Sequence, residues 1–152
     1  MAIFGERQQF KDEALKDLSD ALGMETLIHR IEVFDNSHIS GSFAVSAGVV
    51  YDDGEPNKNL YRRYKLHQGN DDVASMKEVL YRRYFRLLRE EKPMPDLVLV
   101  DGGKPQLNAA LEVLSDLELV WVCSLVKDDR HRTHALMRED GSMISINKTS
   151  SL

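Results

Sequence analysis

Cysteine is almost absent from this 152-residue chain, which has a single one, Cys123, inside an apolar run. An internal disulfide is therefore excluded, and no cluster of cysteine and histidine indicates zinc. Long apolar stretches are also missing, so we expect no membrane-spanning segment. The first ten residues lack the apolar region of a signal peptide, and we expect a cytoplasmic protein without a membrane partner.

An excess of positive charge is missing as well: the net charge is −5, which disfavours strong, non-specific binding of nucleic acid. The charge is unevenly distributed, however. Between Tyr61 and Lys92 the chain has nine basic residues against five acidic ones. The middle of an acidic protein is thus locally basic.

Apolar periodicity predicts a mixed α/β sheet, in which an antiparallel meander is followed by parallel strands with helical crossovers. We expect an amphipathic helix and linker over residues 1–27, packed on a domain of residues 28–152. The helices are predicted at 6–22, 72–91 and from Pro105, and the strands at 31–35, 43–51, 60–66, 97–101, 119–126, 133–138 and 142–146.

The helix over 72–91 is predicted to bury one stripe and to leave its arginines mostly outside. The expected buried residues are Val73, Met76, Leu80, Leu87 and Leu88. Glu32 lies on the opposite strand face from Asp35, which favours a structural ion pair.

Two apolar runs each end on an aspartate just before a predicted loop, at Asp35 and at Asp101. Ligands bind at the carboxyl edge of open α/β sheets, where these side chains would lie. Paired carboxylates are hard oxygen ligands suited to Mg²⁺ or Mn²⁺ and to phosphate chemistry. The alternative is that each aspartate bonds backbone amides in a turn.

Asp101 is followed by Gly102-Gly103-Lys104, which opens a helix where Lys104 could meet a phosphate. The motif is not a Walker loop and also fits a plain tight turn. Ser37 and His38 follow Asp35 too closely for a hydrolytic triad, and we expect them to shape a loop by hydrogen bonding.

Two segments interleave tyrosine with arginine, Tyr61–Lys65 and Tyr81–Arg86, which suits contacts with nucleic acid but also a solvated basic face. His131 and His134 lie in a polar segment that could bind a metal, although a surface loop is the alternative.

Several of these motifs, taken together, resemble the carboxy-terminal endonuclease region of UvrC, the incision subunit of bacterial nucleotide excision repair. The resemblance covers roughly residues 28–152 in collinear order. It is carried by the segments Arg30–Gly41, Tyr61–Lys65, Gly69–Met76, Pro95–Leu107 and Leu125–Thr133.

The resemblance implies a ribonuclease-H-like fold and a metal-dependent 5′ incision in damaged double-stranded DNA. By motif, Asp35 and Asp101 correspond to two residues of the family's catalytic set, with Arg62, Arg63 and Lys104 as candidates for positioning the DNA. The third member is a histidine that we expect beyond Leu152, so His131 and His134 do not inherit its role. The family's partners, UvrB directly and UvrA indirectly, contact parts of the parent protein that we expect outside this chain.

Two other classes of function stay open. The first is a non-catalytic module that uses the same fold to bind DNA or protein, which the missing histidine favours. The second is a related nuclease that acts on RNA or on junctions. Metal-dependent nicking of DNA separates the first class from an endonuclease.

Overall fold

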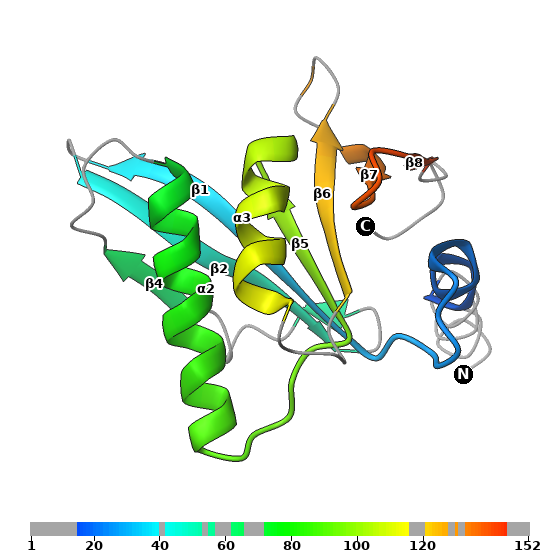
Figure 1. The fold of residues 1–152 in the computed structure, drawn as a ribbon, viewed down its shortest axis with the longest axis horizontal. Coiled ribbons are helices and arrows are strands. Elements are labelled where there is room, and N and C mark those ends of the chain that lie inside the picture. The colour runs from blue at the N-terminus through cyan, green and yellow to red at the C-terminus, as the bar shows by residue number, and fades with distance from the viewer. Residues whose placement is uncertain are drawn as a thin grey trace, which may run out of the picture.

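The structure, a computed structural model, describes most of the chain. The described residues are 15–39, 42–52, 55–56, 62–65, 72–115, 121–127, 130 and 133–145. Within them, eight strands form one mixed sheet, and α2 (Asp72–Arg89) and α3 (Lys104–Leu114) pack on the same face of it (Figure 1). No helix in this part of the chain is long and apolar enough to cross a membrane.

The sheet has the order β3-β2-β1-β5-β6-β7-β8, with β4 also paired to β2. The central strands β1, β5 and β6 are parallel to one another, whereas the flanking pairs are antiparallel. The predicted meander followed by parallel strands is therefore present. The strands are β1 (Arg30–Ile39), β2 (Ser42–Asp52), β3 (Glu55–Pro56), β4 (Arg62–Lys65), β5 (Leu97–Asp101), β6 (Trp121–Lys127), β7 (Thr133–Met137) and β8 (Met143–Ser145).

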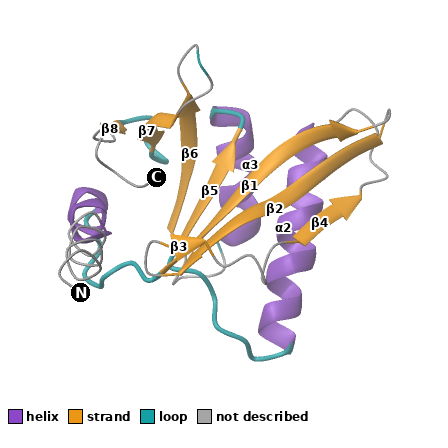
Figure 2. Cartoon of the chain, turned by 180° about the vertical axis from the view of Figure 1, so that it is seen from behind, coloured by secondary structure: helices purple, strands orange, loops and turns teal. Residues whose placement is uncertain are grey.

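Strand β5 is buried on both of its faces, which explains its uninterrupted apolar sequence. Val98 and Val100 belong to the cluster under α2 and α3. Leu97 and Leu99 belong to a second cluster on the opposite face. Figure 2 views the molecule from behind, with α2 and α3 lying beyond the strands.

The second cluster is completed by the amino-terminal part of the chain. Residues 15–22 are helical, and Leu15, Leu18 and Leu22 on this helix are buried with Leu97 and Leu99 of β5. Gly23, with a φ of 76°, follows the last helical residue, and glycine suits this left-handed conformation at the end of a helix. The apolar stripe of this segment is therefore part of the core.

Strand β1 is longer than its sequence predicts. It continues past Asp35 to Ile39, in antiparallel register with β2. Its pairing with β5 stops at Phe34, which lies opposite Val100. The apolar pattern of β1 ends at Phe34 because its pairing with the buried strand β5 ends there. The backbone pairing of β1 with β2 continues beyond that point. The predictions that Asp35 ends a strand and that Ser37 and His38 lie in a loop were therefore wrong.

The exposed and buried faces of α2 also differ from the prediction at two positions. Leu88 is 49% exposed, although the periodicity predicts it as buried. Arg83, predicted outside, has a side chain only 10% exposed. Arg83 lies inward because the buried carboxylate of Glu32 on β1 needs a cationic partner.

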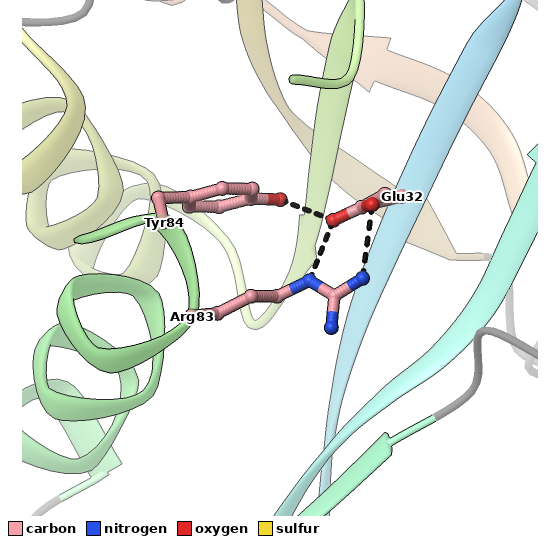
Figure 3. Close-up of polar contacts among 3 residues, drawn as sticks. All are labelled: Glu32, Arg83 and Tyr84. Carbon is pink, nitrogen blue, oxygen red and sulfur yellow. Dashed lines mark hydrogen bonds and ion pairs between the residues drawn. The ribbon is translucent and has the colours of Figure 1, made fainter. Parts of the chain in front are cut away.

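Glu32 is the centre of a buried polar cluster that joins α2 to the sheet (Figure 3). Arg83 donates to both of its oxygens, with Nε–Oε1 at 2.7 Å and Nη2–Oε2 at 3.0 Å. The Tyr84 hydroxyl donates to Oε1 at 2.6 Å. Burial and the neighbouring Glu32 charge raise the pKa of Tyr84 well above its ordinary value. The predicted structural role of Glu32 in an ion pair is thus confirmed.

Replacing Arg83 tests how far α2 depends on this cluster. Arg83→Met should lower the free energy of unfolding by about 3–5 kcal/mol, because the Glu32 charge would stay buried without its partner. Arg82→Met is the matched control: its side chain is 54% exposed and faces Glu78 at 3.7 Å. That change should have an effect below about 1 kcal/mol. Urea denaturation followed by circular dichroism measures both, and equal losses would contradict the assignment.

Candidate active site

The two predicted aspartates lie on neighbouring parallel strands. The ladder between β1 and β5 ends with Phe34 opposite Val100, and Asp35 and Asp101 are the next residues on the two strands. Neighbouring strands are about 4.8 Å apart. The backbone thus places the two aspartates side by side where β5 ends, at the edge from which α3 begins (Figure 1).

The Asp101 carboxylate is partly buried and has a cationic partner. Its side chain is 26% exposed, and its Oδ2 accepts a hydrogen bond from Nζ of Lys127 at 2.9 Å. Lys127 is the last residue of β6, the other parallel neighbour of β5. The space beside Asp101 therefore already accommodates a positive charge.

Lys127 is absent from the site predicted by sequence. It lies in a segment that carries the family resemblance, but a lysine at the end of an apolar run is typical of a solvated strand end. Pairing the run that ends at Asp101 with the run over 121–127 would have found it. In that register Asp101 lies opposite Leu125, and Lys127 is two residues further on.

The turn after Asp101 requires glycine at both of its positions. Gly102 has a φ of 131° and Gly103 a φ of 78°, both rare for residues with a side chain. A Cβ on Gly102 would lie 2.3 Å from Cγ of Gln106 in the first turn of α3. The turn therefore brings α3 close against the end of β5 and fixes where Asp101 stands.

Lys104 opens α3 at this same edge, and its side chain is exposed. A Cβ on Gly141 would lie 3.8 Å from Lys104 Nζ, so the lysine reaches the turn between β7 and β8. Lys104 is thus exposed where α3 begins, with its ammonium near Gly141.

Arg62 and Arg63 lie on β4, two strands away from β1. In the register, Asp35 pairs with Ser46 of β2, and Ser46 pairs with Arg63. Asp35 and Arg63 therefore occupy the same row across the sheet, about 10 Å apart at two strand spacings. Arg62 occupies the adjacent row, which contains Ala47 and Phe34.

The remaining sequence candidates contribute less to this arrangement. Ser37 and His38 lie within β1, paired with Ala44 and Phe43. His131 lies outside the described residues, and His134 is an exposed residue of β7. Burial raises the pKa of the Cys123 thiol to about 11.

The donor set that remains has the chemistry of a hard-cation site. Among the described residues, no three His, Cys, Asp or Glu side chains come together to hold an ion. What the backbone brings together is a pair of aspartates, one of which already has an ammonium at its oxygen. Carboxylate oxygens suit Mg²⁺ and Mn²⁺, so the residues present fit such an ion.

A mixed sheet with parallel central strands, covered by crossover helices on one face, is consistent with a ribonuclease-H-like domain. The sequence matches the family described as the UvrC RNAse H endonuclease domain over residues 19–152. The chain belongs to this family, whose setting is nucleotide excision repair.

Curated relatives agree with this assignment. The UvrABC system protein C of Levilactobacillus brevis is 52% identical over 128 residues, which are 82% of this chain and 21% of that protein. The protein of the same name from Limosilactobacillus reuteri is 48% identical over 143 residues, 90% of this chain and 24% of the relative. The chain thus spans between a fifth and a quarter of the length of these relatives.

The glycine turn gives a direct test of the local geometry. Gly102→Ala should lower the free energy of unfolding by more than about 1 kcal/mol, because it combines an unfavourable φ with a clash against Gln106. Adding Gln106→Ala should return part of that stability, since it removes the clashing side chain. Thermal or urea unfolding of the two single variants and the double variant measures the coupling. Strictly additive effects would show that the clash is unimportant.

Proposed function

We propose that this chain is the part of a UvrC-type protein that hydrolyses a DNA phosphodiester on the 5′ side of a lesion. One observation carries the proposal. In a member of this endonuclease family, the ladder of two neighbouring parallel strands ends with Phe34 opposite Val100, and Asp35 and Asp101 are the residues that follow on the two strands. Two structural aspartates in separate turns would not need this alignment.

Asp35 and Asp101 would hold one or two Mg²⁺ or Mn²⁺ ions through their carboxylate oxygens. A bound ion of this kind activates water and stabilises charge on the leaving 3′ oxygen. Asp101 is suited to its part because its side chain is only 26% exposed, and partial exclusion of water strengthens its attraction for a cation.

The basic residues would bind the DNA backbone beside this centre. Lys104 is exposed at the same edge of the sheet, and Arg63 shares a row with Asp35. Arginine and lysine contacts to phosphates fix the position of a duplex without reading its sequence. Such contacts suit an enzyme that must cut beside lesions of varied sequence.

The parent protein would supply what this chain does not provide. The relatives are several times longer, and their name places them in the UvrABC system. We propose contacts with UvrB, and indirectly UvrA, through those other parts, together with the histidine of the catalytic set. The alternative, a module that binds DNA or protein without cutting, predicts the same fold but no metal-dependent turnover.

Removal of the Asp101 charge tests the catalytic proposal. In a version of the chain extended past Leu152, Asp101→Asn should reduce Mn²⁺-dependent nicking of lesion-bearing plasmid by about a hundredfold or more. Glu112→Gln, which changes a carboxylate 69% exposed on α3, should nick at the unchanged rate. The unextended chain should be much slower than the extended one. Undiminished nicking by Asp101→Asn would show that Asp101 is not part of the catalytic set, whereas no Mn²⁺-dependent nicking by the unchanged extended chain would favour the non-catalytic alternative.

The proposed DNA contacts are tested by their salt dependence. Replacing Arg62 and Arg63 by alanine should weaken DNA binding and reduce the slope of log affinity against log salt by about one for each phosphate that is no longer bound. Replacing Arg82 and Arg86, exposed on α2, serves as the charge-matched control and should change the slope less. Fluorescence anisotropy over a salt series measures both. Equal slopes would favour a solvated basic face instead.

A further inference from the structure

The ion pair between Lys127 and Asp101 differs in kind from the buried pair of Arg83 and Glu32. Glu32 is 1% exposed, and its oxygens accept three hydrogen bonds from Arg83 and Tyr84. Asp101 meets Lys127 through one oxygen, and both side chains keep more than a quarter of their surface exposed. The first pair joins a helix to the sheet, whereas the second joins two strands that are already joined by their own ladder.

The β5–β6 register brings Lys127 within reach of Asp101, from a position further along β6 on the same face of the sheet. Asp101 lies opposite Leu125, so the Lys127 backbone is two residues past the row of the aspartate. The pairing of β6 with β7 shifts register between Val126 and Lys127. The long stem of Lys127 then returns its ammonium to Asp101 Oδ2.

We propose that Lys127 is a tethered cation that competes with the divalent ion for Asp101 and so sets the cation affinity of the site. This inference rests on the proposed function, in which Asp101 is a metal ligand. A divalent ion that takes Oδ2 must displace the ammonium, and this displacement opposes binding. Because the pair is partly shielded from water, bulk salt screens it less than an exposed pair.

The structural alternative gives the opposite expectation. If Lys127 only steadied the ends of β5 and β6, its removal would loosen Asp101 and weaken metal binding. A competing ammonium predicts tighter binding when the charge is removed. The sign of the change in affinity therefore separates the two roles, and it needs no nuclease activity.

The experiment is a titration of this chain with Mn²⁺, following the free ion by electron paramagnetic resonance. Lys127→Met, which keeps the length of the stem, should tighten the Kd for Mn²⁺ about tenfold. Lys127→Arg keeps the charge and should stay close to the original Kd. Lys104→Met removes an exposed positive charge from the same edge of the sheet. It controls for the general electrostatic effect of losing a positive charge and should tighten the Kd for Mn²⁺ less than Lys127→Met does.

Thermal melts of every variant establish that the fold is kept, and Lys127→Gln, a second neutral variant, carries the test if Lys127→Met is destabilised. Weaker or unchanged Mn²⁺ binding by the neutral variant would overturn the proposal. A Lys127→Arg protein that binds as tightly as the neutral variant would overturn it too.

The variant Asp101→Asn separates a failure of the proposed competition by Lys127 from a failure of the proposed function. If Asp101→Asn binds Mn²⁺ as well as the unchanged chain, then Asp101 is not a ligand and both ideas fall. If it binds worse while Lys127→Met is unchanged, only the competition is wrong.

Discussion

The parallel pairing of β5 with β1 on one side and β6 on the other determines most of this structure. β5 is buried between two apolar clusters, one under α2 and α3 and the other under the amino-terminal helical residues 15–22. Its last residue, Asp101, comes directly after the ladder with β1, as Asp35 does on β1, and in the other ladder it lies opposite Leu125 of the strand that carries Lys127. A single five-residue strand thus defines the core and the candidate site together.

The polar cluster around Glu32 is the second constraint on the structure, because it determines where α2 lies on the sheet. Arg83 and Tyr84 are consecutive on the helix, and both reach a carboxylate only three residues before Asp35. The hydrogen bonds satisfy a charge that apolar packing alone could not accommodate. This part of β1 is therefore held from the helix side as well as from both neighbouring strands.

Local patterns were sufficient to predict the elements whose signals are themselves local. The apolar run of β5, the glycine turn into α3 and the two strands predicted at 133–138 and 142–146 all follow from residues near in sequence. The errors came where a distant partner decides. The extension of β1 past Asp35 depends on β2, and the inward side chain of Arg83 depends on Glu32. The contact of Lys127 with Asp101 depends on the β5–β6 register, which no single segment encodes.

The buried thiol of Cys123 has a consequence for how this protein withstands oxidants. With a pKa near 11, the sulfur is almost never a thiolate at neutral pH, and only the thiolate reacts readily with peroxides or disulfides. The single cysteine is 2% exposed in the same cluster as Leu18 and Leu22, and it lines a pocket together with Leu22 and Trp121. A raised pKa and burial together therefore disfavour oxidation of this thiol and its pairing into an intermolecular disulfide.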